Sequence, residues 1–224
     1  MVAPPPRAPE SQPSWAGPVL AVSVAVLIGL VGPLLLFNPW FVSVEQGRND
    51  VPARLGTSQA EVNRVTGQIL CDLLFSCDDF RVGLHTGPPL LTDDERSHMR
   101  DVGNLVRTLW LLVGLAIVGT VLTLSALRGD RRRVGRLLIA AGGLVGMLTL
   151  IVGAVFATAF DQAFLAFHHL FFPQGNFLFG PDSNLLRLFP EGFWFEATLV
   201  AGFTIVLAAA AAGIVGWRLA RGPA

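Results

Sequence analysis

The sequence predicts an all-α membrane protein with four transmembrane helices and an extracytoplasmic cap of short amphipathic helices. Hydrophobic residues make up 52% of the 224 residues, charged residues make up 14%, and the mean hydropathy is +0.58. This composition is typical of a membrane protein and argues against a water-soluble domain. Four stretches without charged residues approach the ~20 residues that a helix needs to cross the hydrocarbon core. No nucleic-acid partner is expected.

The predicted spans cover residues 16–37, 104–127, 137–160 and 197–217, and the uncharged part of the second begins at Thr108. A signal peptide is the alternative interpretation of the first span. Its flank carries one arginine beside Glu10, and no small-x-small cleavage site follows Phe37, so we interpret it as an anchor. Residues 1–15 are rich in proline and are expected to form a disordered cytoplasmic tail.

The arginines predict the orientation of the chain, which contains no lysine. Five arginines stand in the short turn 128–136, and two more stand in the tail 218–224. By the positive-inside rule, this turn and both termini face the cytoplasm. The segments 38–103 and 161–196 therefore lie outside. Tryptophans near the ends of the spans are expected to act as interface anchors: Trp15, Trp40, Trp194 and Trp217.

The first outer segment contains an amphipathic helix. Thr57 or Ser58 is expected to cap it, with Glu61 completing a capping box. Apolar residues then recur on one face: Val62, Val65, Ile69 and Leu73. This face is expected to pack on the membrane or on neighbouring helices.

A second capping box, formed by Thr92 and Glu95, opens a helix that continues through His98 into the second span. His98 thus stands on a helix that is about to enter the bilayer. Asp94 and Asp101 lie four residues before and three residues after it, on its face of the helix. Both carboxylates are in a position to orient the ring or to favour its charged form.

The second outer segment begins with a helix that ends at Pro173. Together with the third span it is too long for one straight crossing, so we expect a kink or turn near Asp161. His168 lies two helical turns after Asp161, among phenylalanines that shield it from water. His169 is rotated by about 100° around the helix and is expected to point elsewhere.

Two further features have structural interpretations. Cys71 and Cys77 lie in an outer segment, where a disulfide is permitted but two free thiols are almost as plausible from their spacing. Gly142 and Gly146 form a small-x-x-x-small pattern that suits close helix packing.

Two short motifs resemble the signatures of the lipoprotein intramolecular transacylase family, Lit. The first, E-x-x-H-M-x-D-V, occupies residues 95–102, and the second, F-H-x-L-F-F, occupies residues 167–172. The likeness continues through Gly175 and Asn176 to Glu191 and covers nearly the whole chain. One departure is the sequence Phe-Gly-Pro-Asp at residues 179–182, where the family commonly has an F-D-P-like turn.

The resemblance implies an acyltransferase in the bacterial cytoplasmic membrane, with its active site on the outer face. The enzyme would move the sn-2 acyl chain of an S-diacylglyceryl-cysteine lipoprotein to that lipoprotein's own N-terminal amine, giving the lyso form. The expected partners are this lipoprotein and membrane lipid, and no cofactor or metal is expected. The implied catalytic residues are His98 and His168, which should face one cavity where the cap meets the membrane. The implied supporting residues are Asp94, Arg100, Asp101, Asp161, Phe164, Phe171, Phe172 and Asn176.

Two other functions remain open from the sequence. Asp94, His98, Asp101 and His168 also suit a zinc site, which would make the protein a metal-dependent membrane hydrolase. The third possibility is a scaffold without catalytic activity, whose outer cap binds a partner.

Overall fold

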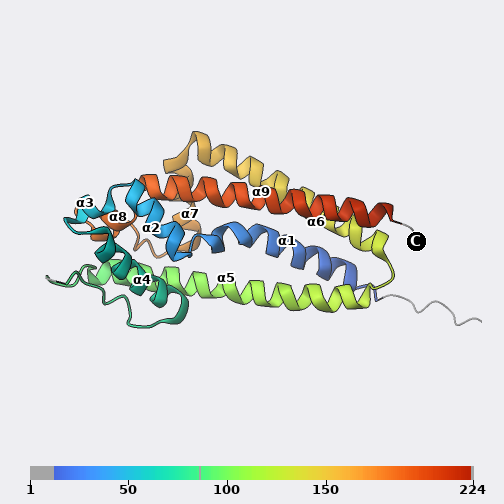
Figure 1. Cartoon of the computed structure of the whole chain (residues 1–224), viewed down its shortest axis with the longest axis horizontal. Coiled ribbons are helices and arrows are strands. Elements are labelled where there is room, and N and C mark those ends of the chain that lie inside the picture. The colour runs from blue at the N-terminus through green and yellow to red at the C-terminus, as the bar shows by residue number, and fades with distance from the viewer. Residues whose placement is uncertain (1–12, 86, 223–224) are drawn as a thin grey trace, which may run out of the picture.

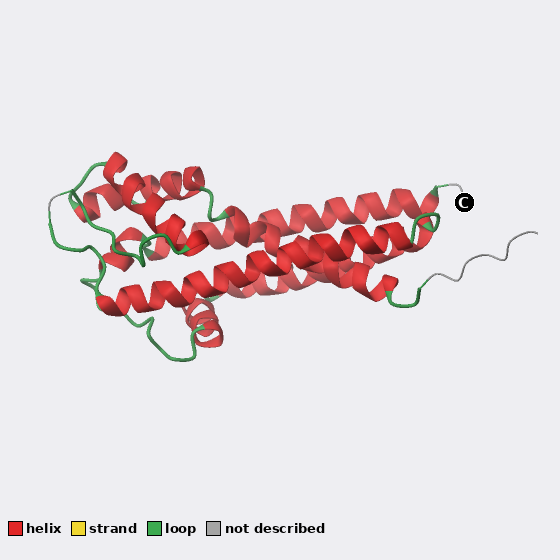
Figure 2. Ribbon diagram, turned by 90° about the horizontal axis from the view of Figure 1, so that it is seen from below, coloured by secondary structure: helices red, strands yellow, loops and turns green. Residues whose placement is uncertain are grey.

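The chain forms an elongated bundle of four long helices with a cap of smaller helices at one end (Figures 1 and 2). The computed structural model describes residues 13–85 and 87–222. The tail expected over residues 1–15 therefore lies mostly outside the described residues. Within the described ranges, four helices are long and apolar enough to cross a membrane: α1 (Ala16–Leu35), α5 (Asp93–Ala126), α6 (Arg131–Thr158) and α9 (Glu191–Arg221). The prediction of an all-α membrane fold is confirmed.

The cap contains the shorter helices, most of which lie between α1 and α5 in the sequence. They are α2 (Pro39–Arg48), α3 (Val51–Leu55), α4 (Gln59–Phe75) and α8 (Asn184–Leu188). Another short helix, α7 (Phe160–Phe171), follows α6 directly. In Figure 1 it lies crosswise to the long helices, at the end of the bundle next to the cap. The chain breaks between α6 and α7 at Ala159 (φ −145°, ψ 54°), close to the turn expected near Asp161.

Small residues allow the long helices to approach closely. α6 and α9 share the most extensive contact in the bundle, and α1 packs against α5, α6 and α9. A Cβ atom on Gly142 would lie only 2.7 Å from the carbonyl oxygen of Ala209, and one on Gly146 would lie 3.3 Å from the Ala209 side chain. The small-x-x-x-small pattern is therefore the face of α6 that contacts α9, as close packing of membrane helices requires.

The cap has an apolar core of its own. The predicted face of α4 is buried in it, with Val62, Val65 and Ile69 fully inaccessible. Ser58 caps the helix, because its hydroxyl accepts a hydrogen bond from the Glu61 amide at 3.2 Å. The carboxylate of Glu61 instead binds Arg64 and the amide of His85. The expected capping box is therefore incomplete, and Glu61 joins α4 to the loop that follows it.

A complete capping box begins α5. The Thr92 hydroxyl accepts from the Glu95 amide, and the Glu95 carboxylate accepts from the Thr92 amide. Glu95 is almost fully buried, and it also accepts hydrogen bonds from the Ser183 hydroxyl and from the Leu185 amide. One carboxylate therefore fixes the start of α5 and attaches α8 to it.

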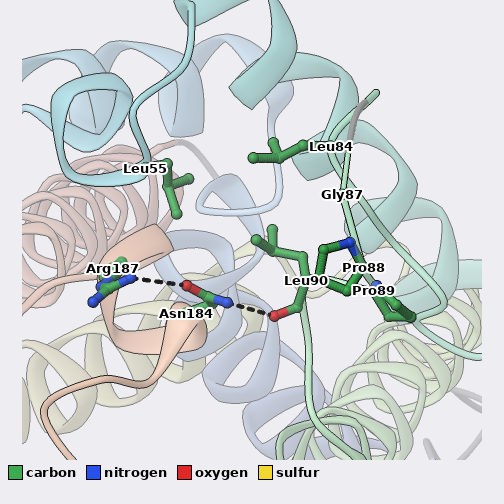
Figure 3. A pocket seen from close by; sticks show the side chains of 8 residues that line it. All are labelled: Leu55, Leu84, Gly87, Pro88, Pro89, Leu90, Asn184 and Arg187. Atoms are coloured by element: carbon green, nitrogen blue, oxygen red, sulfur yellow. Dashed lines mark hydrogen bonds between the residues drawn. The ribbon is translucent and has the colours of Figure 1, made fainter.

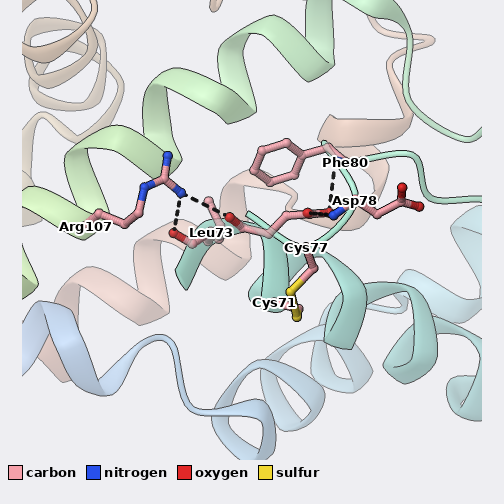
Figure 4. The surroundings of a disulfide bond; sticks show 7 residues. Cys71, Leu73, Cys77, Asp78, Phe80 and Arg107 are labelled. Carbon is pink, nitrogen blue, oxygen red and sulfur yellow. Dashed lines mark hydrogen bonds between the residues drawn. A yellow bond between two sulfur atoms is a disulfide. The ribbon is translucent and has the colours of Figure 1, made fainter. Parts of the chain in front are cut away.

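Cys71 and Cys77 form a disulfide at the end of α4 (Figure 4). The spacing of the two cysteines had left open whether they are paired or free. Beside it, the buried Asp72 carboxylate accepts hydrogen bonds from the amides of Asp78 and Phe80. The guanidinium of Arg107 donates to the carbonyl oxygens of Asp72 and Leu73, both at 3.2 Å. These bonds satisfy carbonyls at the end of α4 and attach that helix to α5.

Candidate active site

His98 lies in the second turn of α5, where the helix leaves the cap. Its residue surface is 6% exposed. Phenylalanine rings surround it, with centroids at 4.9 Å for Phe172, 5.7 Å for Phe179 and 6.5 Å for Phe177. An apolar environment of this kind disfavours a positively charged imidazolium.

His168 is brought to the same place by α7, with its ring centroid 5.9 Å from that of His98 and the planes inclined by 29°. Its Nδ1 lies 2.8 Å from the carbonyl oxygen of Phe164, one helical turn earlier. A carbonyl oxygen can only accept, so Nδ1 carries the hydrogen and donates it, which leaves Nε2 with a lone pair. Burial lowers the pKa of His168, and the neighbouring His169 lowers it further.

Polar groups from the loop after α7 complete the surroundings of His98. The side-chain amides of Gln174 and Asn176 both donate to Oδ2 of Asp101, at 2.6 and 2.7 Å. Asp101 lies one turn after His98 on α5, so these two bonds hold the loop against the helix that carries the histidine. Nδ1 of His98 and Oδ1 of Asn176 are both buried and make no hydrogen bond of ordinary geometry.

An aromatic wall continues from the histidines toward α9. Phe164 contacts His168 with its ring centroid at 4.3 Å, and it also contacts Phe160 at 5.5 Å and Trp194 at 6.0 Å. Trp194 was expected to be an interface anchor. It lies between Phe164 and Phe193 and forms part of this wall, and its role as an anchor stays a prediction.

The structure brings only some of the expected supporting residues together. Asp101, Asn176, Phe164 and Phe172 lie around the two imidazoles. Phe171 is 44% exposed and packs on Phe167.

The other three expected supporting residues lie apart from the imidazoles. Asp94 and Asp161 are exposed, and neither makes a hydrogen bond or ion pair within the described ranges. The guanidinium of Arg100 binds the Asp79 carboxylate at 3.1 Å. This hydrogen bond lowers the pKa of Asp79. The Asp94 side chain stands at the exposed start of the helix, in solvent, and a role for it beside His98 stays a prediction.

Sequence reasoning did not assign a role to Gln174, Phe177, Phe179 or Trp194. Three of these residues lie in the irregular segment between α7 and α8, where no helical or strand period indicates which side chains point inward. The only available signal was the high density of phenylalanine near the second motif.

The clearest cavities lie in the cap, away from both histidines. One has a volume of about 200 Å³ (Figure 3) and is lined by Leu55, Leu84, Gly87, Pro88, Pro89, Leu90, Asn184 and Arg187. Another, of about 270 Å³, lies between α2 and α4. The two catalytic candidates were expected to face a shared cavity. Their rings are adjacent, but phenylalanine side chains pack directly against them.

The described residues do not place three histidine, cysteine or carboxylate side chains together as a metal site. The group considered for zinc is divided, because Asp94 remains in solvent and Asp101 is bound by two amides. Two adjacent imidazoles in an apolar environment are better suited to the transfer of a proton.

Comparisons with known proteins agree with this geometry. The model of the family described as lipoprotein intramolecular transacylase Lit matches residues 19–194. An uncharacterized protein of Aquifex aeolicus is 27% identical over 146 residues, which are 62% of this chain. The chain spans about 63% of the length of that curated relative.

Solved structures with the same fold come from Bacillus cereus. The membrane-integral lipoprotein intramolecular transacylase Lit of that organism superposes with a TM-score of 0.80 at 18% identity, covering 92% of this chain and 94% of the other. A structure of the same Bacillus protein with one histidine replaced by alanine has a TM-score of 0.74, with 92% of each chain covered.

Proposed function

The chain belongs to the lipoprotein intramolecular transacylase family, and we propose that it converts diacylated lipoproteins to the lyso form. The enzyme is an acyltransferase. Its substrate carries an S-diacylglyceryl cysteine at the N-terminus. The sn-2 acyl chain leaves the glycerol oxygen and joins the α-amino nitrogen of the same molecule.

The proposed site lies at the outer surface of the bacterial cytoplasmic membrane. The arginine-rich turn between α5 and α6 is at the opposite end of the bundle from the cap (Figure 1). The positive-inside rule places that turn and both termini in the cytoplasm, and so places the cap and the two histidines outside. Membrane lipid surrounds the apolar faces of the long helices, which carry many exposed leucine, isoleucine and valine side chains.

His98 and His168 are the proposed catalytic residues. The uncharged amine attacks the ester carbonyl, and an N–C bond forms as the C–O bond to the glycerol breaks. One imidazole takes the proton that the nitrogen loses, and the pair returns a proton to the departing glycerol oxygen. A buried, neutral imidazole with a free Nε2 is suited to the first of these transfers.

The reaction also requires that the amine and the ester be held close together and that water be excluded, and the aromatic side chains around the histidines suit both requirements. Both reacting groups belong to one substrate, so holding them in attack geometry supplies roughly 7–11 kcal/mol of the reduction in barrier. Rings of Phe164, Phe172 and Phe177 around the histidines exclude water. Water would otherwise hydrolyse the ester.

The observation that carries this proposal is the approach of the two imidazoles, from α5 and α7, to 5.9 Å. The test uses a bacterial host that lacks lipoprotein N-acylation, with and without the full chain. Fragmentation mass spectrometry of lipoprotein N-termini reports whether the amine carries an acyl chain. We expect lyso-form lipopeptides only when the chain is present, and we expect a chelator to leave the conversion unchanged. Unaltered diacylglyceryl termini in the presence of the inserted protein would exclude the activity.

A further inference from the structure

Two buried polar atoms next to the catalytic candidates lack partners of ordinary geometry, namely Nδ1 of His98 and Oδ1 of Asn176. The Asn176 side chain is nevertheless close enough to His98 to interact with its imidazole. Buried polar groups are rarely left without a hydrogen bond. Because a ring N–H can donate and an amide oxygen can accept, these two atoms are natural partners.

Asp101 determines which way the amide of Asn176 faces. Nδ2 of Asn176 donates to Oδ2 of Asp101 at 2.7 Å. An ionised carboxylate can only accept, so the amide NH₂ must face Asp101 and the amide oxygen must face the other way. That oxygen is the atom left without a partner beside His98.

The direction of the amide in turn determines the tautomer of His98. An amide oxygen accepts but does not donate, so Nδ1 of His98 must carry the hydrogen when the two groups are paired. Nε2 then has the lone pair. The carbonyl oxygen of Phe164 imposes the same tautomer on His168, at 2.8 Å. Both rings therefore present an unprotonated Nε2.

We propose that Asp101 and Asn176 are positioning residues that hold His98 in its Nδ1–H tautomer, so that Nε2 is free to take the proton of the substrate amine. Asp101 directs the amide, and the amide directs the imidazole. This inference rests on the proposed transacylase function. It explains why an aspartate and an asparagine stand at positions 101 and 176.

Gln174 provides a matched control. Its Nε2 donates to the same Asp101 oxygen at 2.6 Å, and its side chain is exposed. Gln174→Met and Asn176→Leu each remove an amide and one hydrogen bond to Asp101 while keeping an apolar side chain of similar shape. Only the second removes a group beside His98.

The tautomer is measured by ¹⁵N nuclear magnetic resonance of the full chain in detergent, with labelled histidine and with the His98 signal assigned by its loss in His98→Ala. We expect the Nδ1–H form in the parent protein and in Gln174→Met. Asn176→Leu should populate the Nε2–H form and lower the rate at saturating substrate by roughly 10–100-fold, the cost known for groups that orient metal-bound histidines. Asp101→Asn is the second variant, and its amide should allow Asn176 to rotate and give a mixture of both forms.

Three results would overturn the inference: an Nε2–H tautomer in the parent protein, a slower Asn176→Leu variant whose tautomer is unchanged, or a changed tautomer with an unchanged rate. The second of these would mean that Asn176 only supports the loop. Failure of the transacylase proposal is a separate outcome, because the parent protein would then produce no lyso-form lipoprotein, whatever the tautomer measurement shows.

Discussion

The two histidines of the site are held in different ways. His168 is fixed within its own helix, by the carbonyl oxygen of Phe164 one turn earlier. His98 stands on α5, and the polar groups beside it come from a loop about 75 residues later in the chain. The geometry at His98 therefore depends on tertiary structure, while that at His168 is largely local.

At the scale of single residues, the burial of His168 predicts the pH at which its imidazole becomes protonated. Burial disfavours the imidazolium and lowers the pKa of His168 below the ordinary value of 6.5. The ring should therefore remain neutral at pH values where a free histidine is already half charged, and should become protonated only at lower pH. A histidine NMR titration in detergent, assigned with His168→Ala, measures the midpoint. A midpoint at or above 6.5 would show that the ring is solvated.

At the residue level, the sequence predicted the histidine pair and its register, because His168 and His169 point in different directions on a helix. It did not predict Gln174 or Phe177, which lie in an irregular loop without periodicity. It also did not predict the exposure of Asp94, since a side chain in the first turn can share a helix face with His98 and still remain in solvent.

At the scale of helices, the starts of α4 and α5 and the packing face of α4 were predictable. Capping residues and a 3.6-residue apolar period are local signals. The partners of the capping carboxylates were not predictable, because Glu61 binds a later loop and Glu95 binds α8. These contacts join segments that are distant in sequence.

The contact between α2 and α9 contains a buried carboxyl group. Burial raises the pKa of Glu45 to about 7, and the adjacent Glu196 adds to the increase. The Arg48 guanidinium lies 3.1 Å from the Glu196 carboxylate. The folded protein therefore favours protonated Glu45, whose contribution to stability is complete below pH 4.5 and is lost as the pH rises through about 7.

Glu45→Gln should remove this pH dependence, because an amide needs no proton to remain uncharged. We expect the variant to have a higher thermal midpoint than the parent protein above pH 7, and the difference to shrink at acidic pH. The same substitution at the exposed Glu191, at the start of α9, serves as the control. A Glu45→Gln variant that is equally destabilised at every pH would show that Glu45 is needed as a carboxylate.

At the scale of the whole molecule, the structure has two separate apolar cores. One core lies in the cap and the other among the long helices. The four spans were predictable from hydropathy alone. The way in which the cap folds against the bundle was not, because it depends on the irregular segments before and after α8.

The orientation inferred from the arginines can be tested by labelling cysteines placed at the two ends of the bundle. A cysteine at Arg132 should be protected from an impermeant thiol reagent in intact cells, because the turn is expected to be cytoplasmic. A cysteine at the exposed Leu178, between α7 and α8, should be labelled. The two native cysteines form a disulfide and do not compete. Labelling of the cysteine at position 132, without labelling at position 178, would show that the orientation is the reverse of the one proposed.

The most direct test of the catalytic proposal compares two adjacent residues of α7. His168 lies against His98, whereas His169 is exposed and packs on Phe177. Each is replaced by alanine, membrane insertion is checked, and the N-terminal lipopeptide masses are recorded. His168→Ala should reduce lyso-form production by about 10²–10⁴-fold, the usual contribution of a proton-transfer group, and His169→Ala should retain most of it. Normal conversion by His168→Ala would contradict the proposed role of the histidine pair.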